Sequence, residues 1–189
     1  MDETQTEAGF ATPSEITAGA TEAFVHGRNF EPSVTISWNG KPQVTKFVTG
    51  NLAQITLDEG LTDNIGSGAV TADNGDGFIS RATTTAIVPG NFEIKTISPA
   101  SAKAGAAALT LTLKGSGFAN FTSNTLTPLV RWNGAELAAN IVNAITVTAQ
   151  VPANLLAVPG NVSVSIRICS QPGCNFFNES NSVTFTVLP

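Results

Sequence analysis

The chain has 189 residues, of which 42% are apolar and 12% are charged, and its formal net charge at pH 7 is −5. Its basic residues are scattered along the sequence, which argues against binding to nucleic acid or to anionic membrane surfaces, because both require a basic footprint. No stretch approaches about 18 consecutive apolar residues, so the sequence predicts no membrane insertion.

The chain opens with a polar and acidic segment, residues 1–12, that shows no periodicity. Such a segment is expected to be loosely held unless something outside the domain holds it. An acidic opening is the reverse of the basic and then apolar opening of a signal peptide. We therefore expect either a cytosolic protein or the mature part of an exported one, with the signal peptide absent from this sequence.

A half-buried strand is predicted at Val34–Trp38, where apolar and polar residues alternate. An Asn-Gly pair follows, which favours a tight hairpin turn. The same Trp-Asn-Gly tripeptide recurs at Trp132, 94 residues later (38 to 132), and these are the only two tryptophans. This internal repeat predicts one domain written twice, at residues 13–90 and 91–189.

The two halves share a second landmark, a glycine that ends a strand and is followed three residues later by phenylalanine. Gly27 precedes Phe30, and Gly115 precedes Phe118. The residue directly before each phenylalanine is Asn29 or Gly117, and an Asn or Gly followed by Phe suggests a left-handed or bulged backbone that directs the ring into the core. We therefore interpret both phenylalanines and both tryptophans as core residues rather than as ligand platforms.

The segment Asp73–Ser80 comes near the calcium-loop pattern D-x-[DN]-x-[DN]-G, with Asn74 and Asp76 as its candidate ligands. Ala72 stands where the pattern requires its first aspartate, and Thr83 stands where it requires a bidentate glutamate. We interpret the segment as a hairpin turn and keep calcium as the minor alternative.

Alternation continues in the second half, and no segment of ten or more residues carries a helical stripe. The alternating runs are Leu109–Lys114, Val162–Ile168 and Val183–Val187. Short strands separated by turns predict an all-β chain folded as two β-sandwiches in tandem.

Cys169 and Cys174, the only cysteines, are separated by Ser-Gln-Pro-Gly, which indicates a turn. Two strands that leave a four-residue turn bring Cβ atoms to within about 4 Å, so a disulfide is favoured, and two free thiols are the alternative. Two sulfur ligands with no histidine or second cysteine pair nearby make a poor zinc site. An oxidised pair implies an extracellular or periplasmic setting.

Several motifs together resemble the IPT/TIG immunoglobulin-like domain, in particular the repeats of bacterial secreted and surface proteins. They are Gly-x-Gly-Phe after a strand, Trp-Asn-Gly at a strand end, and the closing Asn-Ser-Val-Thr-Phe-Thr-Val. The segment from about Thr96 to Pro189 fits closely, and the segment from about Phe10 to Pro89 is more diverged. The resemblance implies tandem domains of this fold and specifies no ligand, because the family includes receptor ectodomains, surface proteins, accessory modules of carbohydrate enzymes and Rel-type transcription factors.

No constellation typical of an enzyme is present. His26, the only histidine, lies in an alternating run and is expected to face solvent, and neither a phosphate-cradling loop nor a Gly-x-Ser-x-Gly elbow occurs. We expect no catalysis, no cofactor and no metal other than the calcium alternative. The sequence favours an extracellular structural or adhesion module, as part of a surface assembly or filament, and the alternative is a carbohydrate-binding accessory module of a secreted enzyme.

Three aromatic residues have the sequence context of loops: Phe121, in a segment that the first half lacks, and Phe176 and Phe177, next to the cysteine pair. Exposed phenylalanines mark contacts with other proteins or neighbouring domains, so these three form the expected interaction surface. The expected partners are other protein domains or further copies of the chain, with polysaccharide as the alternative. Self-association through a strand donated by residues 1–12 is a further expectation.

Overall fold

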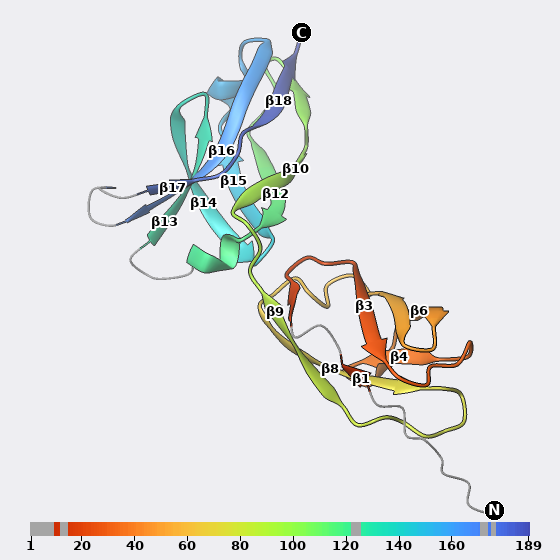
Figure 1. Ribbon diagram of the computed structural model, residues 1–189. Helices are drawn as coiled ribbons and strands as arrows, with labels where there is room; N and C mark the ends of the chain where they lie inside the picture. Colours follow the sequence, from red (N-terminus) through yellow and green to blue (C-terminus); the bar gives the residue numbers. More distant parts are fainter. Residues whose placement is uncertain (1–9, 12–14, 122–125, 171–173, 175–176) are drawn as a thin grey trace, which may run out of the picture. The chain divides into compact units, whose positions relative to one another are not determined.

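A computed structural model describes residues 10–11, 15–121, 126–170, 174 and 177–189 of the chain, and the side chains of residues 10, 11 and 177 are not considered. The chain divides into two compact units, Met1–Val88 and Pro89–Pro189 (Figure 1). Both units are built of β-strands, and the helical segments among the described residues are two short 3₁₀ turns, in the second unit. The predicted all-β class with immunoglobulin-like sandwiches is confirmed.

The first unit contains two sheets, with strand orders β1-β3-β7-β6 and β2-β9-β8-β4-β5. Neighbouring strands run antiparallel, except that β2 and β9 are parallel. The strands are β1 (Phe10–Ala11), β2 (Glu15–Thr17), β3 (Glu22–Gly27), β4 (Thr35–Trp38), β5 (Lys41–Pro42), β6 (Val44–Thr49), β7 (Leu52–Thr56), β8 (Gly66–Asp73) and β9 (Thr83–Val88).

The core of the first unit lies between these sheets and follows the predicted alternation. Trp38 is only 2% exposed, and Phe30 is also buried, so the interpretation of both as core residues is confirmed. Gly68 on β8 lies against the Trp38 indole, and a Cβ atom at Gly68 would overlap that ring. His26 on β3 is exposed, as predicted.

In the second unit the strands follow the order β10-β12-β15-β14-β13-β16-β18-β11, and β17 pairs with β16. The strands are β10 (Glu93–Ser98), β11 (Ser101–Lys103), β12 (Leu109–Ser116), β13 (Leu126–Trp132), β14 (Ala135–Asn143), β15 (Thr146–Val151), β16 (Gly160–Ser170), β17 (Phe177–Glu179) and β18 (Val183–Leu188). The two 3₁₀ turns are η1 (Phe118–Phe121) and η2 (Ala153–Leu156).

One strand of the second unit belongs to both layers of its sandwich. The first residues of β14 pair with β13, and its later residues pair with β15. The first two strands of the second unit, β10 and β11, also have partners in different layers. β10 pairs antiparallel with β12, and β11 pairs parallel with β18. Between the layers lie Phe118, which is fully buried, and Trp132, 3% exposed, whose ring centroid is 4.9 Å from that of Phe185.

The two Trp-Asn-Gly elements make the same hydrogen bonds in their two units. Asn39 and Asn133 both have positive φ, 51° and 46°. The Asn39 Oδ1 atom accepts a hydrogen bond from the Ala69 N–H at 2.8 Å, and the Asn133 Oδ1 atom accepts one from the Ser163 N–H at 2.8 Å. Each asparagine therefore fastens a strand end to the neighbouring strand of its sheet.

The N-terminal segment differs in part from the expectation that it is loosely held. Phe10 and Ala11 pair with Gly27 and His26 of the same chain, so β1 is an edge strand of the first unit. Backbone pairing of this kind needs only extended geometry and not an apolar pattern, which is why periodicity did not indicate it. Residues 1–9 and 12 lie outside the described residues.

Candidate functional site

The long strand β16 carries the site on one of its two faces. Val164, Ile166 and their alternating neighbours point into the core, whereas Ser165, Arg167 and Cys169 lie on the opposite, outer face. Ser165 and Cys169 are nevertheless buried, Cys169 completely. Other side chains therefore cover this part of the outer face.

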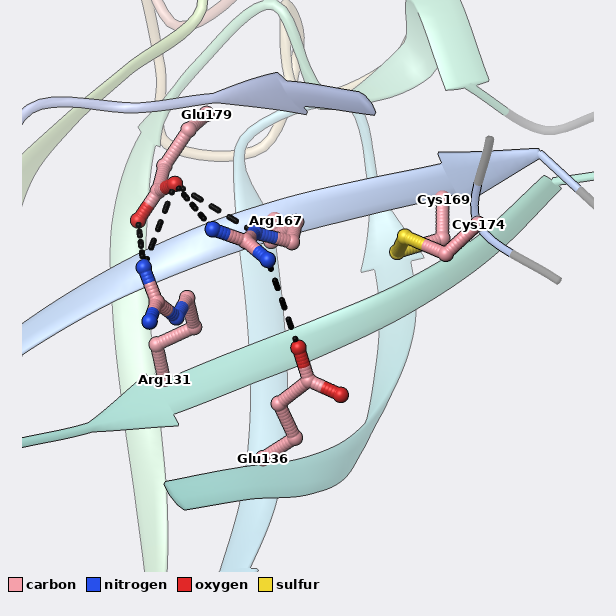
Figure 2. The surroundings of a disulfide bond; sticks show 6 residues. All are labelled: Arg131, Glu136, Arg167, Cys169, Cys174 and Glu179. Atoms are coloured by element: carbon pink, nitrogen blue, oxygen red, sulfur yellow. Dashed lines mark hydrogen bonds and ion pairs between the residues drawn. A yellow bond between two sulfur atoms is a disulfide. The ribbon is translucent and has the colours of Figure 1, made fainter. Parts of the chain in front are cut away.

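Glu179 on β17 is the centre of the covering layer (Figure 2). Its carboxylate accepts hydrogen bonds from the Arg131 Nη1 atom at 3.1 Å and from the Arg167 Nη2 atom at 3.0 Å. The Ser165 hydroxyl donates a third at 2.8 Å. The three donors come from β13 and β16, so one carboxylate joins three strands.

The charged cluster, defined as Arg131, Glu136, Arg167 and Glu179, is partly shielded from water. Arg167 also pairs with Glu136 on β14, at 3.5 Å between Nη1 and Oε1 (Figure 2). The Arg167 and Glu179 side chains are 18% and 25% exposed, respectively. The Arg131 Nε atom is buried and has no hydrogen-bond partner. Two positive and two negative charges leave the cluster formally neutral.

The environment of Glu179 changes its acidity. Burial raises the pKa of its carboxyl group, but hydrogen bonds from Ser165, Arg167 and Arg131 outweigh that effect, so the pKa lies below its ordinary value of 4.5. The carboxylate is therefore ionised at neutral pH. It holds the two guanidinium groups together.

The strands β16 and β17 form a hairpin, which also contains a disulfide. Cys169 on β16 is bonded to Cys174, with 4.6 Å between their Cα atoms. This is the predicted pairing, and the alternative of two free thiols is not observed. Cys174 adopts a positive φ of 53°, and its N–H donates a hydrogen bond to the Ser170 carbonyl at 2.9 Å. Figure 2 shows the disulfide and the charged cluster on the same face of β16.

The described residues offer little for chemistry beyond this scaffold. Within the described ranges, no three His, Cys, Asp or Glu side chains gather where they could hold a metal ion. In the same part of the chain, no helix is both long enough and apolar enough to cross a membrane.

The calcium alternative rested on Asn74 and Asp76. The Asn74 side chain accepts a hydrogen bond from the Glu31 N–H and donates one to the Asn29 carbonyl, so it holds its hairpin against the preceding loop. The Asp76 Oδ1 atom accepts the Phe78 N–H at 3.0 Å. Both side chains thus serve turn geometry.

The expected aromatic surface is only partly described. Phe121 lies in η1, half-buried, with its ring centroid 4.7 Å from that of Phe92, and it packs at the border of the core. Phe176 lies outside the described residues, and Phe177 is described only as the β17 residue that pairs with Cys169. The proposal of an interaction surface at these residues stays a prediction.

Sequence reasoning missed the charged cluster, although a comparison of the two halves carries a signal for it. Arg131 lies 94 residues after Ser37, and Arg167 lies 94 residues after Asp73. Asp73 faces Ile79 in an isolated bridge, in the place where Arg167 faces Glu179 in the second unit. The charges are therefore specific to the second half, and an alignment of the two halves would have shown them.

The fold and this site define a class of protein, an immunoglobulin-like β-sandwich module in which the outer face of one sheet carries a disulfide-closed hairpin. The IPT/TIG domain model matches residues 93–187, just over half of the chain. The chain belongs to the IPT/TIG domain family. No curated protein matched the chain.

Comparison with solved structures gives weak likenesses. A Bacteroides ovatus protein, SGBP-B of a mixed-linkage glucan utilization locus in complex with a mixed-linkage heptasaccharide, is 14% identical over 99% of this chain, with a TM-score of 0.35. This chain spans 47% of that protein. The fibronectin(III)-like modules of Clostridium thermocellum CbhA are 14% identical over 96% of this chain and 94% of theirs, with a TM-score of 0.31. A chimeric titin Z1Z2 is 17% identical over 97% of both chains, with a TM-score of 0.29.

Proposed function

We propose that this chain is a non-catalytic structural or adhesion module of a bacterial extracellular or cell-surface protein, and that it contacts other proteins through the hairpin between β16 and β17. The observation that carries the proposal is that two kinds of interaction stabilise this hairpin: the Cys169–Cys174 disulfide and the hydrogen bonds that Glu179 accepts. Two strands that are already held together lose less conformational entropy when they bind a partner. The corresponding hairpin of the first unit, where Asp73 faces Ile79, is held by hydrogen bonds of Asn74 and, among the described residues, by neither a disulfide nor an ion pair.

The extracellular setting is supported by the disulfide, because such bonds persist in oxidising compartments and are rare in the cytosol. Thiol titration of the protein from its source, alkylated during lysis, tests this part of the proposal. We expect no free thiol, whereas two alkylated cysteines would contradict an extracellular location.

We also propose that the first unit is a diverged second copy of the IPT/TIG domain. The hydrogen bonds of Asn39 and Asn133 support this, because each links residues that are 30 positions apart in the sequence. A second pair of bonds agrees: the Ala72 N–H donates to Ser80 Oγ, and the Ile166 N–H donates to Ser180 Oγ.

A second candidate is a carbohydrate-binding module, and one observation favours it. Phe24 on β3 is 52% exposed, and its cross-strand partner Gln54 donates a hydrogen bond to Glu22 on the same face. An exposed ring beside an amide and a carboxylate is a combination that can stack on a sugar and bind its hydroxyl groups.

Retention on two kinds of surface separates the candidates. The unaltered chain, the double variant Cys169→Ser/Cys174→Ser and the variant Phe24→Ala are passed over immobilised proteins from the source cell surface and over insoluble polysaccharides. An adhesion module is retained on protein, and the cysteine variant loses that retention. A carbohydrate module is retained on polysaccharide, and Phe24→Ala loses it. Retention on neither surface contradicts both candidates.

A further inference from the structure

The lysines of this chain are concentrated on the edges of its sheets. The chain has five lysines, and four of them lie in strands that pair on one side only: Lys41 in β5, Lys46 in β6, Lys95 in β10 and Lys103 in β11. All four side chains are exposed. The edge strands make up only a small part of the chain, so a random distribution would place most lysines elsewhere.

We propose that these lysines prevent the sheets from extending by pairing with a strand of a second molecule, and that Lys46 is the most important of them. A free edge presents unpaired N–H and C=O groups that any extended chain can satisfy. A lysine there opposes pairing, because a partner strand would have to desolvate the ammonium group or, in a pair of identical edges, face a like charge. This inference does not depend on the proposed adhesive role.

The strand β6 has the greatest need of such protection. Its sequence is Val-Thr-Lys-Phe-Val-Thr, in which every residue except Lys46 is β-branched or aromatic. Short segments of this composition, without proline or glycine, are typical of aggregating strands. Val44 is 73% exposed and Val48 is 41% exposed, and β7 is the only described strand that pairs with β6.

Within the described part of the chain, Lys46 has no ion pair that would neutralise it. Among the described residues, the ion pairs of lysine are Lys41 with Asp58 at 2.6 Å and Lys95 with Glu93 at 3.7 Å. Lys46 lies opposite Gln54 across the β6–β7 pair. No described acidic side chain therefore pairs with its ammonium group at this edge.

The other long edge strand, β10, is protected in two further ways. The Asn181 side chain accepts the Ile94 N–H at 2.7 Å and donates to the Ile94 carbonyl at 3.0 Å, so it occupies the backbone groups that a partner strand would use. The register of β10 then shifts between Ile94 and Thr96, which makes Lys95 the bulged residue. Bulges and lysines both oppose edge pairing.

The fifth lysine supplies a matched control. Lys114 is exposed, but it lies in the central strand β12, between Thr96 on one side and Thr146 on the other. Lys46→Thr and Lys114→Thr each lower the formal charge of −5 by one. A general effect of charge on solubility would change both variants equally.

The experiment measures the molar mass by light scattering over a series of concentrations for the unaltered chain, Lys46→Thr, Lys46→Glu and Lys114→Thr. We expect Lys46→Thr to associate at concentrations about tenfold lower than the unaltered chain. Lys46→Glu, which keeps a charge at the edge, and Lys114→Thr should behave as the unaltered chain does. The fluorescence of the buried tryptophans verifies that each variant is folded.

Two results would overturn the inference: association of Lys46→Thr that matches the unaltered chain, or equal association of Lys46→Thr and Lys114→Thr. If Lys46→Thr does not fold, Lys46→Gln, which also removes the charge from β6, replaces it, with Lys114→Gln as the control and the same two deciding outcomes.

Discussion

Asparagine 133 has two separate structural roles, because its backbone has a positive φ and its side chain accepts the Ser163 N–H. Asn133→Gly keeps the favourable backbone and removes only the hydrogen bond, so we expect a loss of about 1 kcal/mol in the free energy of unfolding. Asn133→Ala also places in the left-handed region a residue that tolerates it less well than asparagine or glycine, which adds about 1 kcal/mol. Urea unfolding of the two variants measures both effects, and equal losses would contradict this division.

The same division is expected at Asn39, whose backbone and side chain have the same geometry. The pair Asn39→Gly and Asn39→Ala is therefore an internal replicate in the other unit. A loss at one asparagine without a comparable loss at the other would show that the two hydrogen bonds differ in importance.

Glu179 makes stability depend on pH in the acid range. Its pKa is lowered in the folded state, so its contribution is fully present above the unfolded pKa, near 4.5, and is lost as the pH falls through the folded value. We expect Glu179→Gln to lose about 2 kcal/mol at neutral pH, because two guanidinium groups lose their partner. The difference between the variant and the unaltered chain should then shrink below about pH 4.5.

Thermal melts at a series of pH values test this expectation. Asp58→Asn is the matched control, because the pKa of Asp58 is also lowered, by a hydrogen bond from Lys41, but that ion pair lies in water. Exposed ion pairs contribute little to stability, so this variant should melt as the unaltered chain does at every pH. A pH-independent loss in Glu179→Gln would contradict the ionic role of Glu179.

Individual residues differ in how well the sequence predicts them. Trp38 and Phe118 could be assigned to the core because bulk and alternation are local properties. The bond between Glu179 and Arg131 could not, because it depends on the register of β16 with both β13 and β17. One residue of slip in either pair would place the two side chains on opposite faces.

At the scale of the element, the hairpin between β16 and β17 depends on its disulfide. Cys169 and Cys174 are five positions apart, and closing so small a loop is expected to stabilise the second unit by about 2 kcal/mol. Replacing both cysteines with serine should lower the denaturation midpoint by the corresponding amount. Hydrogen exchange should also accelerate at the end of β16, with little change in β12 on the other sheet.

Reducing the unaltered chain is the control for this prediction, because it opens the same bond without burying a hydroxyl group at Cys169. The first unit has no cysteine, so its unfolding should not respond to reductant. A disulfide whose loss leaves exchange in β16 unchanged would not be fastening the hairpin.

Among the elements, strands with strict alternation were predicted well, and strands that change partners were not. The run Leu109–Lys114 lies within β12 as expected. In β14, alternation alone could not reveal that pairing passes from β13 to β15, because Ala138 and Ala139 follow each other without a break in the strand. Such a transfer is fixed by the packing of two sheets and not by the local pattern.

At the scale of the whole molecule, each unit has its own buried core, so each should fold without the other. We expect separate fragments of residues 1–88 and 89–189 to unfold cooperatively, and calorimetry of the full chain to resolve two transitions. The second unit has the disulfide and the charged cluster, so its transition should occur at the higher temperature. A single transition that neither fragment reproduces would contradict independent folding.

The parallel pairs β2–β9 and β11–β18 determine how the units respond to mechanical force. In each unit a strand near the N-terminal end runs parallel to the last strand, so tension applied at the two ends pulls the paired strands along their length in opposite directions. The hydrogen bonds between them are then loaded together, in shear, and do not open one after another. Both units gain mechanical resistance from this arrangement, so stretching single molecules from their termini should show a distinct force peak for each unit.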